Sequence, residues 1–356
     1  MAKSFAPRRR WLDAIALILC IGMIWGLSMP AVVVNREAAR RAQCTNNVKN
    51  LALATVNFEI TQKQYPGYQA LFGNRDDGSA KTGSWAVALL PLLEQSELRD
   101  TWDDPTTHES WQAAVRDKDE QKLQAFYPAV QVFICAEDLS QKAKFGALSY
   151  GVNAGLHLLP NDPALGLSQY ANAGDASEHS SISQRSENGV FANRAGPNVV
   201  DPHTGLSTQV FGYHADRIQS QNLRDGLSQT FLFSENCSSL SWLDYSIVDD
   251  SSRSKLGIVW LYAGDSASEG RPKPTAVTAD MRINNGKNKS KLGPFRARPS
   301  GFHAGGIVVA AFADGSTSSI SSEIDYHIYQ SLMAPHDSAS DIPNRAYVLK
   351  DEDYQL

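Results

Sequence analysis

The sequence predicts an α+β protein that begins with one long helix and continues as a body of short strands and long polar loops. An uncharged N-terminal run passes without a turn signal into a helical apolar pattern, which predicts the helix. Short apolar runs that follow Gly or Asp-Gly, separated by stretches rich in Ser, Asn and Gly, predict the body. With 356 residues, the chain is long enough for a sizeable hydrophobic core.

The first element is the apolar run over residues 14–34, which starts at Ala14, includes Pro30, ends at Val34 and carries no charge. As a helix with about 1.5 Å rise per residue it is roughly 31 Å long, close to the roughly 30 Å hydrocarbon core of a bilayer. We therefore expect a transmembrane helix. A cleaved signal peptide is the alternative, but its apolar core is ordinarily only ~7–15 residues long, and no small-x-small site precedes Arg36.

The expected transmembrane helix divides the chain into parts on the two sides of the membrane. Basic residues before the run, Lys3 and Arg8 to Arg10, favour a cytoplasmic N-terminus and an exported C-terminal part. We expect a single-pass protein of the cell membrane, with its globular domain in the periplasm or at the cell surface. The expected parts are a cytoplasmic basic tail (1–13), the transmembrane helix (14–34), its exposed continuation (35–62) and an exported globular α+β domain (63–356).

The charge balance bears on possible partners. A net charge of −5 argues against nucleic-acid binding, which needs a concentrated basic surface. One basic cluster lies between Arg282 and Arg298 among Asn, Gly and Pro, and we interpret it as a solvated loop rather than a polyanion site. The membrane, other copies and related subunits remain as expected partners, and no small-molecule ligand can be named.

The cysteines occupy positions 20, 44, 135 and 237. Cys20 lies in the apolar run, and the other three would lie outside the reducing cytosol, where disulfides persist. We expect a disulfide between Cys44 and Cys135, which ties the exposed part of the helix to the globular body. Two separate buried thiols are the alternative, because Cys237 could compete. No cysteine or histidine pair has zinc-ligand spacing.

In the body, residues 84–95 form an apolar segment interrupted at Pro91, with residues 130–135 as the expected partner. Residues 160–187 and 263–300 read as polar loops, and residues 334–356 as a loosely packed tail. The pattern predicts strands over 188–191, 229–235, 257–262 and 306–313, and a short amphipathic helix over 323–333.

Asp314 and Gly315 stand between the apolar strand 306–313 and an alternating segment that ends at Ile320, which predicts a hairpin. A two-residue turn would place both residues at positive φ. A calcium-binding role for Asp314 is the alternative that we disfavour. Asp225 and Gly226 have the same ambiguity, and we again favour a turn.

The sequence contains no recognised catalytic motif. His303, followed by Gly305 and Gly306, could present an imidazole to a ligand, but we favour a histidine that caps the following strand, with glycines that allow close backbone packing. Glu235 is expected to close a strand with a salt bridge rather than to act as a general acid. We therefore expect no catalytic, cofactor-binding or metal-binding residues and no enzymatic activity.

Several ordered blocks resemble a large family of pilin-like exported proteins of unknown function that is expanded in planctomycete bacteria. The blocks are Met29-Pro-Ala-Val32, Arg36 to Arg41, Cys44 to Leu51, Ser84-Trp85, Leu89 to Gln95, Cys135, Ser149 to Asn153, Asn188 to Phe191, Asp225 to Glu235 and His303 to Ser316. The resemblance implies a long helix packed on a mainly antiparallel sheet, as in type IV pilins and type II secretion pseudopilins. It implies no known activity, and the family's label suggests solute binding.

One departure concerns N-terminal processing. In pilin-like members a prepilin peptidase cuts after a glycine, but Arg8 stands at the corresponding position here. The pilin glutamate corresponds to Asp13, which we regard as a possible assembly residue. Two functions are therefore favoured: a structural or assembly protein of the cell envelope, and a membrane-tethered extracytoplasmic module that binds a solute or a partner. An exported enzyme is a third hypothesis, which we disfavour.

Overall fold

The computed structural model describes most of the chain outside the long loops. The residues described are 8–74, 80–140, 145–157, 185–195, 198–200, 207–209, 217–239, 241–243, 255–264, 274–284 and 296–354. The predicted loop over 160–187 and half of the basic cluster lie largely outside these ranges. Side chains of residues 24–35, which include Pro30 and Val34, also lie outside the described part.

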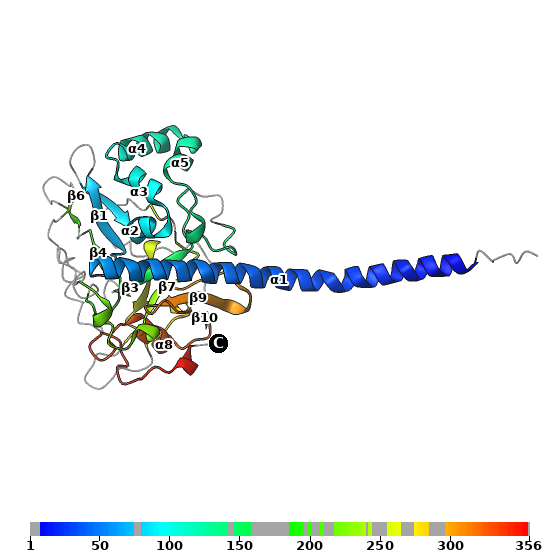
Figure 1. Cartoon of the computed structure of the whole chain (residues 1–356). Helices are drawn as coiled ribbons and strands as arrows, with labels where there is room; N and C mark the ends of the chain where they lie inside the picture. The colour runs from blue at the N-terminus through cyan, green and yellow to red at the C-terminus, as the bar shows by residue number, and fades with distance from the viewer. Residues whose placement is uncertain are drawn as a thin grey trace, which may run out of the picture.

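The chain begins with the 55-residue helix α1 (Arg8–Gln62), which lies along the body and projects far beyond it (Figure 1). Its C-terminal half buries Cys44, Val48, Leu51 and Ala52, whose spacing places them on one helix face. The helix ends where Lys63 adopts a left-handed φ of 55°, shortly before Pro66. The predicted helix and its end are thus confirmed.

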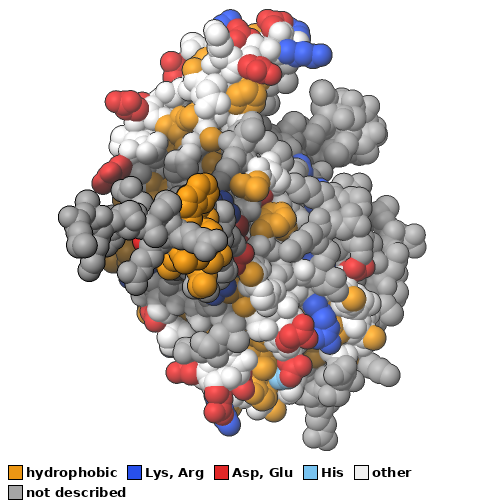
Figure 2. Space-filling model, turned by 90° about the vertical axis from the view of Figure 1, so that its right-hand side faces the viewer, with side chains coloured by type: hydrophobic (Ala, Val, Ile, Leu, Met, Phe, Trp, Pro, Cys, Tyr) orange, Lys and Arg blue, Asp and Glu red, His pale blue; other side chains and the backbone are white. Residues whose placement is uncertain are grey.

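The N-terminal half of α1 has no described contact with the body. Figure 2 looks at the molecule from the side to which the helix projects, with hydrophobic side chains of the helix in front of the body. Across the described residues, no helix has the combined length and apolar character needed to cross a membrane. The transmembrane segment therefore stays a prediction.

The central sheet has five strands in the order β10-β9-β7-β3-β8. All neighbouring pairs are antiparallel except β3 and β8, which are parallel, so the sheet is mixed but mainly antiparallel. The strands are β3 (Tyr150–His157), β7 (Phe231–Glu235), β8 (Gly257–Leu261), β9 (Ile307–Phe312) and β10 (Thr317–Ser321). The strands predicted over 229–235, 257–262 and 306–313 are thus confirmed, with ends shifted by up to two residues.

Two hydrophobic clusters cover the two faces of this sheet. Along β9, Val309 and Ala311 belong to the cluster that contains the buried face of α1, whereas Val308, Ala310 and Phe312 belong to the cluster under helix α8 (Tyr326–Met333). Side chains of a strand alternate between faces, so a strand that is apolar throughout must be covered on both sides. The body therefore has three layers: α1, the sheet and α8.

A second group of elements extends the α1 side of the core. Ser84 caps α2 (Trp85–Leu89) by accepting a hydrogen bond from the Ala86 amide at 3.2 Å, and Pro91 lies in the following 3-10 turn η1 (Leu90–Leu93). Trp85 packs edge-on against Phe133 with ring centroids 5.8 Å apart. The expected contact between 84–95 and 130–135 is therefore present, although Phe133 lies in the short 3-10 turn η2 (Gln131–Phe133) and not in a strand.

The remaining elements are short. Strands β1 (Gln69–Asn74), β2 (Ala80–Ser84) and β4 (Asn193–Arg194) form a three-stranded sheet, and β5 (Asn198–Val200) pairs with β6 (Ser207–Gln209). Three helices lie above this region, namely α3 (Ser96–Asp103), α4 (Thr107–Asp117) and α5 (Glu120–Phe126) (Figure 1). Further 3-10 turns are η5 (Ser220–Asn222), η6 (Leu227–Gln229), η7 (Ala279–Met281), η9 (Ala304–Gly306) and η10 (Asp351–Asp353).

Two local expectations were wrong. Residues 188–191 form no strand: a turn ends at Asn188, and the amides of Val190 and Phe191 both donate to the single Asn153 carbonyl, at 3.3 and 2.9 Å. The C-terminal tail is not loose either, since Ile342, Leu349 and Tyr354 are all less than 8% exposed. Its apolar residues, although sparse, cover the α8 side of the sheet.

The hairpin between β9 and β10 is present, but its turn differs from the expected one. Gly315 has a φ of 83°, whereas Asp314 does not have a positive φ. The Gly315 amide donates to the Phe312 carbonyl at 3.0 Å, and the Phe312 amide donates to the Ser316 carbonyl at 2.9 Å. This is a three-residue loop, in which only the last residue needs the left-handed conformation.

Candidate functional site

The junction between α1 and the body contains a disulfide between Cys44 and Cys135, whose Cα atoms are 5.0 Å apart. The predicted pairing is confirmed, and both cysteines are buried. Cys237 is buried and lies outside this disulfide, with its Sγ 3.2 Å from Oγ of Ser300, and Cys20 is exposed on α1. The bond covalently joins the helix to the segment that follows η2.

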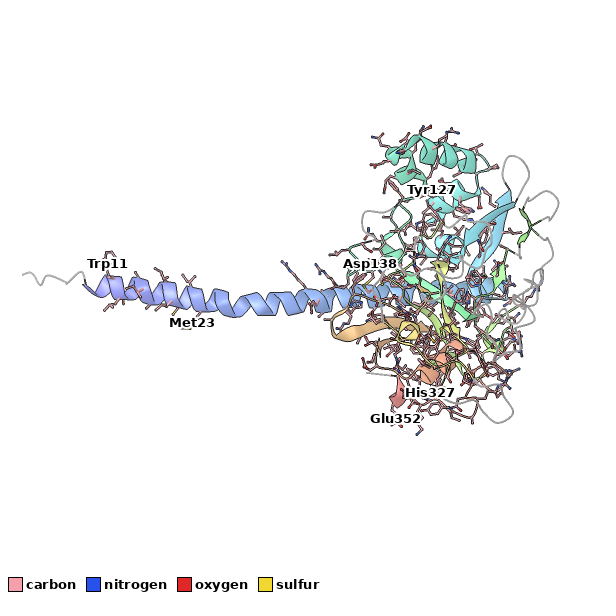
Figure 3. The ribbon with its side chains drawn as sticks, turned by 180° about the vertical axis from the view of Figure 1, so that it is seen from behind. Trp11, Met23, Tyr127, Asp138, His327 and Glu352 are labelled. Atoms are coloured by element: carbon pink, nitrogen blue, oxygen red, sulfur yellow. A yellow bond between two sulfur atoms is a disulfide. The ribbon has the colours of Figure 1, made fainter. Side chains whose placement is uncertain are left out.

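Polar contacts next to the disulfide also join α1 to the segment over residues 131–137. The Asn47 side-chain amide donates to the carbonyls of Gln131 and Ile134, at 3.2 and 3.0 Å. Arg40 forms an exposed ion pair of 3.4 Å with Glu137. The loop after Cys135 continues to Asp138, which lies beside α1 where the helix meets the body (Figure 3).

Directly at the disulfide lies a buried pair of ionisable residues from two other elements. Glu235 is the last residue of β7, and His303 immediately precedes η9. Nε2 of His303 lies 2.7 Å from Oε1 of Glu235, and both side chains are 2% exposed. The backbone amide of Val309 donates to the other carboxylate oxygen, Oε2, at 2.9 Å. Glu235 therefore closes β7 against His303, and this contact is a salt bridge only when the imidazole is protonated.

The disulfide and this pair form one cluster of four side chains, which we call the junction cluster: Cys44, Cys135, Glu235 and His303. One ligand atom from each lies within 4.8 Å of those of the other three. Sγ of Cys135 is 3.0 Å from Oε1 of Glu235 and 3.8 Å from Nε2 of His303. The Ala136 amide donates to Sγ of Cys44 at 3.1 Å.

The geometry of the junction cluster does not suit nucleophilic catalysis. A cysteine–histidine–carboxylate triad uses the two imidazole nitrogens separately, one toward the nucleophile and one toward the carboxylate. Here the same atom, Nε2 of His303, lies near both Cys135 and Glu235. The donor types, two sulfurs, one imidazole and one carboxylate, are instead those that hold a transition-metal ion.

The surroundings of the junction cluster are strongly desolvated. Burial raises the pKa of the Tyr150 phenol well above its usual value, and the negative charge of Glu235 raises this pKa further. Tyr150 stands opposite Glu235 in the antiparallel pair β3–β7. Gly301 lies on another side, and a Cβ there would be 2.6 Å from Oε2 of Glu235. The carboxylate thus has little room to move.

His303 and the glycines that follow it do not have the roles that we expected. The His303 side chain makes no capping hydrogen bond to the following turn, because the imidazole is directed to Glu235. Gly305 and Gly306 adopt φ values of 79° and 69°. A Cβ at Gly305 would meet no atom within 4 Å, so this glycine supplies a left-handed conformation rather than close packing.

The other predicted residues lie away from the junction cluster. Asp13 is exposed on the projecting part of α1. Asp314 is exposed at the hairpin tip, where its Oδ1 accepts hydrogen bonds from the Ser316 amide and hydroxyl, at 2.8 and 2.6 Å. This turn role agrees with the reading that we favoured over calcium binding.

Asp225 and Gly226 form the expected turn, in which Gly226 has a φ of 112°. An unexpected partner is Asp337, whose amide donates to Oδ2 of Asp225 at 2.6 Å. Burial, and secondarily the charge of Asp225, raise the pKa of Asp337 to about 8. No sequence signal singled out Asp337, because its tail was expected to be loose.

Comparison with known proteins places the chain in a family without assigning an activity. No curated protein and no solved structure matches it. A family model described as protein of unknown function (DUF1559), with a label that refers to solute binding, matches residues 35–327. The match includes all four residues of the junction cluster and most of the globular body. The chain therefore belongs to this family of proteins of unknown function, DUF1559.

Proposed function

We propose that this protein is an exported, membrane-anchored component of the cell envelope with a structural or assembly role. The observation that carries the proposal is the division of α1 into two parts. The C-terminal part is buried in the body and joined to it by the disulfide. The N-terminal part, which carries Trp11 and Met23, projects away from the body (Figure 3). It exposes large apolar side chains, including Trp11 at 75%, Ile18 at 68% and Met23 at 66%.

The distribution of these apolar side chains favours lipid over a single protein partner. Leu17, Ile18 and Leu19 are consecutive and all at least 60% exposed. Consecutive helix residues point about 100° apart, so apolar groups surround the helix instead of forming the single stripe typical of a helix–helix contact. An isolated helix of this kind is stable in hydrocarbon, where its backbone polar groups are satisfied internally.

Two features support export and the pilin-like role. A disulfide across the junction suits an oxidising compartment. A long helix that lies on one face of a mainly antiparallel sheet is what the resemblance to pilins and pseudopilins implies. Asp13, exposed on the projecting helix, is the residue through which neighbouring subunits would recognise each other.

Topology labelling tests the location. In a Cys20→Ser background, Ser96→Cys places an exposed thiol on α3 and Ser4→Cys places one in the N-terminal tail. A membrane-impermeant maleimide added to intact spheroplasts is expected to label the first variant only, and lysis is expected to expose the second. Alkaline carbonate should leave the protein in the membrane. Release by carbonate, or labelling of Ser4→Cys before lysis, contradicts the proposal.

The alternative is a tethered module that binds a solute or a partner, in line with the family's label. Its specific support is a polar pocket of about 150 Å³ beside α8, lined by Arg282, Asp325, His327, Gln330 and Asn344 among others. Typical ligand pockets have roughly 300–1,000 Å³, so only a small polar solute would fit. A rise in unfolding temperature with such a solute, lost in Asp325→Asn, would favour this alternative.

A further inference from the structure

We propose that the junction cluster binds one divalent transition-metal ion of the zinc class when the Cys44–Cys135 disulfide is reduced. The ligands are Sγ of Cys44, Sγ of Cys135, Oε1 of Glu235 and Nε2 of His303. The disulfide and the metal site would be two exclusive states of the same four side chains. This inference does not depend on the proposed envelope role.

The donor set and its compactness carry the inference. Two thiolates, one imidazole and one carboxylate are ligands that four-coordinate zinc accepts, at bond lengths of about 2.0–2.3 Å. In a tetrahedron with such bonds the ligand atoms lie roughly 3.2–3.8 Å apart. The observed separation of 3.8 Å between Cys135 Sγ and His303 Nε2 already fits. The 2.7 and 3.0 Å separations from Glu235 Oε1 need only a small widening.

Groups around the cluster support the ligands in the way that second-layer contacts do in metal sites. The Val309 amide holds Oε2 of Glu235 at 2.9 Å, which leaves Oε1 directed to the cluster centre. The Ala136 amide donates to Sγ of Cys44 at 3.1 Å, and such a donor stabilises a negatively charged sulfur. Both amides belong to the backbone and are therefore fixed by the fold.

The contact between Cys135 and Glu235 also favours a second state. A disulfide sulfur carries no proton, so its 3.0 Å approach to Oε1 is not a hydrogen bond while the disulfide is intact. With a thiol the same contact is an S–H···O hydrogen bond, and with a metal both atoms become ligands. Three anionic ligands around a dication leave one net negative charge, whereas the same three anions without a metal would be strongly unfavourable in a buried site.

The chemical balance is simple. A thiol or phosphine reductant supplies two electrons, the S–S bond breaks, and two protons convert the sulfurs into thiols. Binding of the metal ion displaces these two protons and forms two metal–sulfur bonds. In the reverse direction a disulfide-class oxidant accepts two electrons from the dithiolate and two protons from solvent and becomes two thiols, while the S–S bond re-forms and the metal ion is released.

The test uses the full chain in detergent with Cys20→Ser, which removes the exposed thiol. The protein is reduced with a phosphine, freed of the reductant without oxygen, and titrated with Co²⁺ and then Zn²⁺. We expect one Co²⁺ per chain, with the sulfur-to-cobalt charge-transfer absorption of a thiolate site, and displacement by Zn²⁺. The oxidised protein is expected to bind neither ion. Circular dichroism follows the fold throughout.

Variants distinguish metal binding by all four side chains of the junction cluster from binding by the two cysteine thiols alone. Glu235→Gln and His303→Gln keep the side-chain size, and each is expected to weaken Zn²⁺ binding at least about tenfold. Cys237→Ser removes a buried thiol outside the cluster and is expected to leave binding unchanged. If reduction unfolds the chain, recovery of the fold on addition of Zn²⁺ supports the proposal. Failure to recover it, less than one metal per chain, or unchanged affinity in both ligand variants overturns the proposal.

Discussion

Glu235 Oε1 and His303 Nε2 lie 2.7 Å apart in the buried layer between α1 and the sheet, although 68 residues separate them in the chain. The contact adjoins the disulfide, so the helix, β7 and the loop before β9 meet at one point. A substitution in any one of these elements should therefore alter the packing of the other two and the stability of the junction.

The disulfide is expected to be the strongest single link between α1 and the body. Closing a loop across a separation of 91 residues stabilises by about 4 to 5 kcal/mol in the chain-entropy model. The double variant Cys44→Ser/Cys135→Ser should therefore lower the unfolding free energy by an amount of this order, measured by urea unfolding of the oxidised protein. Cys237→Ser is the control and should change little. Equal stability of the parent and the double variant would refute this role.

Gly301 is expected to be intolerant of a side chain because it faces the buried carboxylate. The Cβ of Gly301→Ala would lie 2.6 Å from Oε2 of Glu235, which is held by the Val309 amide. Such overpacking typically lowers the unfolding free energy by about 1–3 kcal/mol. Gly264→Ala is the matched control, since its Cβ would make ordinary contacts of 3.7 Å. Urea midpoints that shift equally in the two variants would show that the carboxylate has room to move.

The hairpin turn makes a second glycine prediction. Gly315 has a φ of 83°, a conformation that β-branched residues adopt only with strain. Gly315→Val is expected to destabilise by roughly 1–3 kcal/mol, and Gly315→Asn by less, because asparagine tolerates left-handed φ. Thermal unfolding of the two variants measures the difference. A valine variant as stable as the asparagine variant would argue against backbone strain at this position.

Asp337 predicts a pH dependence of stability. Its folded-state pKa of about 8 lies above the value near 4 of an unfolded aspartate. Between these values the folded state keeps a proton that the unfolded state has lost, so the contribution of this group to stability falls as the pH rises from about 4 to about 8.

Urea unfolding at pH 5 and pH 9 checks this dependence. Asp337→Asn cannot ionise, so the loss of stability between the two pH values should be smaller in this variant than in the parent. Asp117→Asn on the exposed face of α4 is the control. An identical loss in the parent and in Asp337→Asn would exclude Asp337 as its source.

Asp13 predicts an effect on assembly but not on folding, since it is exposed on the projecting part of α1. If neighbouring copies recognise this carboxylate, Asp13→Ala and Asp13→Asn should both reduce crosslinking between copies in membranes. The urea midpoint of the body should stay the same in both. Unchanged crosslinking in both variants would leave Asp13 as an interfacial residue without an assembly role.

A related measurement concerns the N-terminus. Because Arg8 stands where a prepilin peptidase would need a small residue, membrane-extracted protein should retain its first residues. Intact-mass measurement checks this. A product that starts at Arg9 with a methylated amine would mean that the chain is processed like a pilin.

The sequence alone determined the elements that depend on neighbouring residues. The long helix, the strands β7, β8 and β9, and the hairpin at Gly315 follow from periodicity and turn chemistry, which act over a few residues. The strand expected over 188–191 failed for the same reason. Its apolar pattern is suitable, but both the Val190 and Phe191 amides are taken by the Asn153 carbonyl, whose position depends on a distant strand.

Only the tertiary structure shows that the four residues of the junction cluster lie together. Cys135, Glu235 and His303 are separated by 100 and 68 residues, so a search for closely spaced ligands could not group them. Each residue taken singly had an ordinary reading as a disulfide cysteine, a strand-end glutamate or a capping histidine. Their chemistry depends on mutual distance and burial, and these arise when α1 and the sheet close around them, because distant segments meet only through the packing of the whole core.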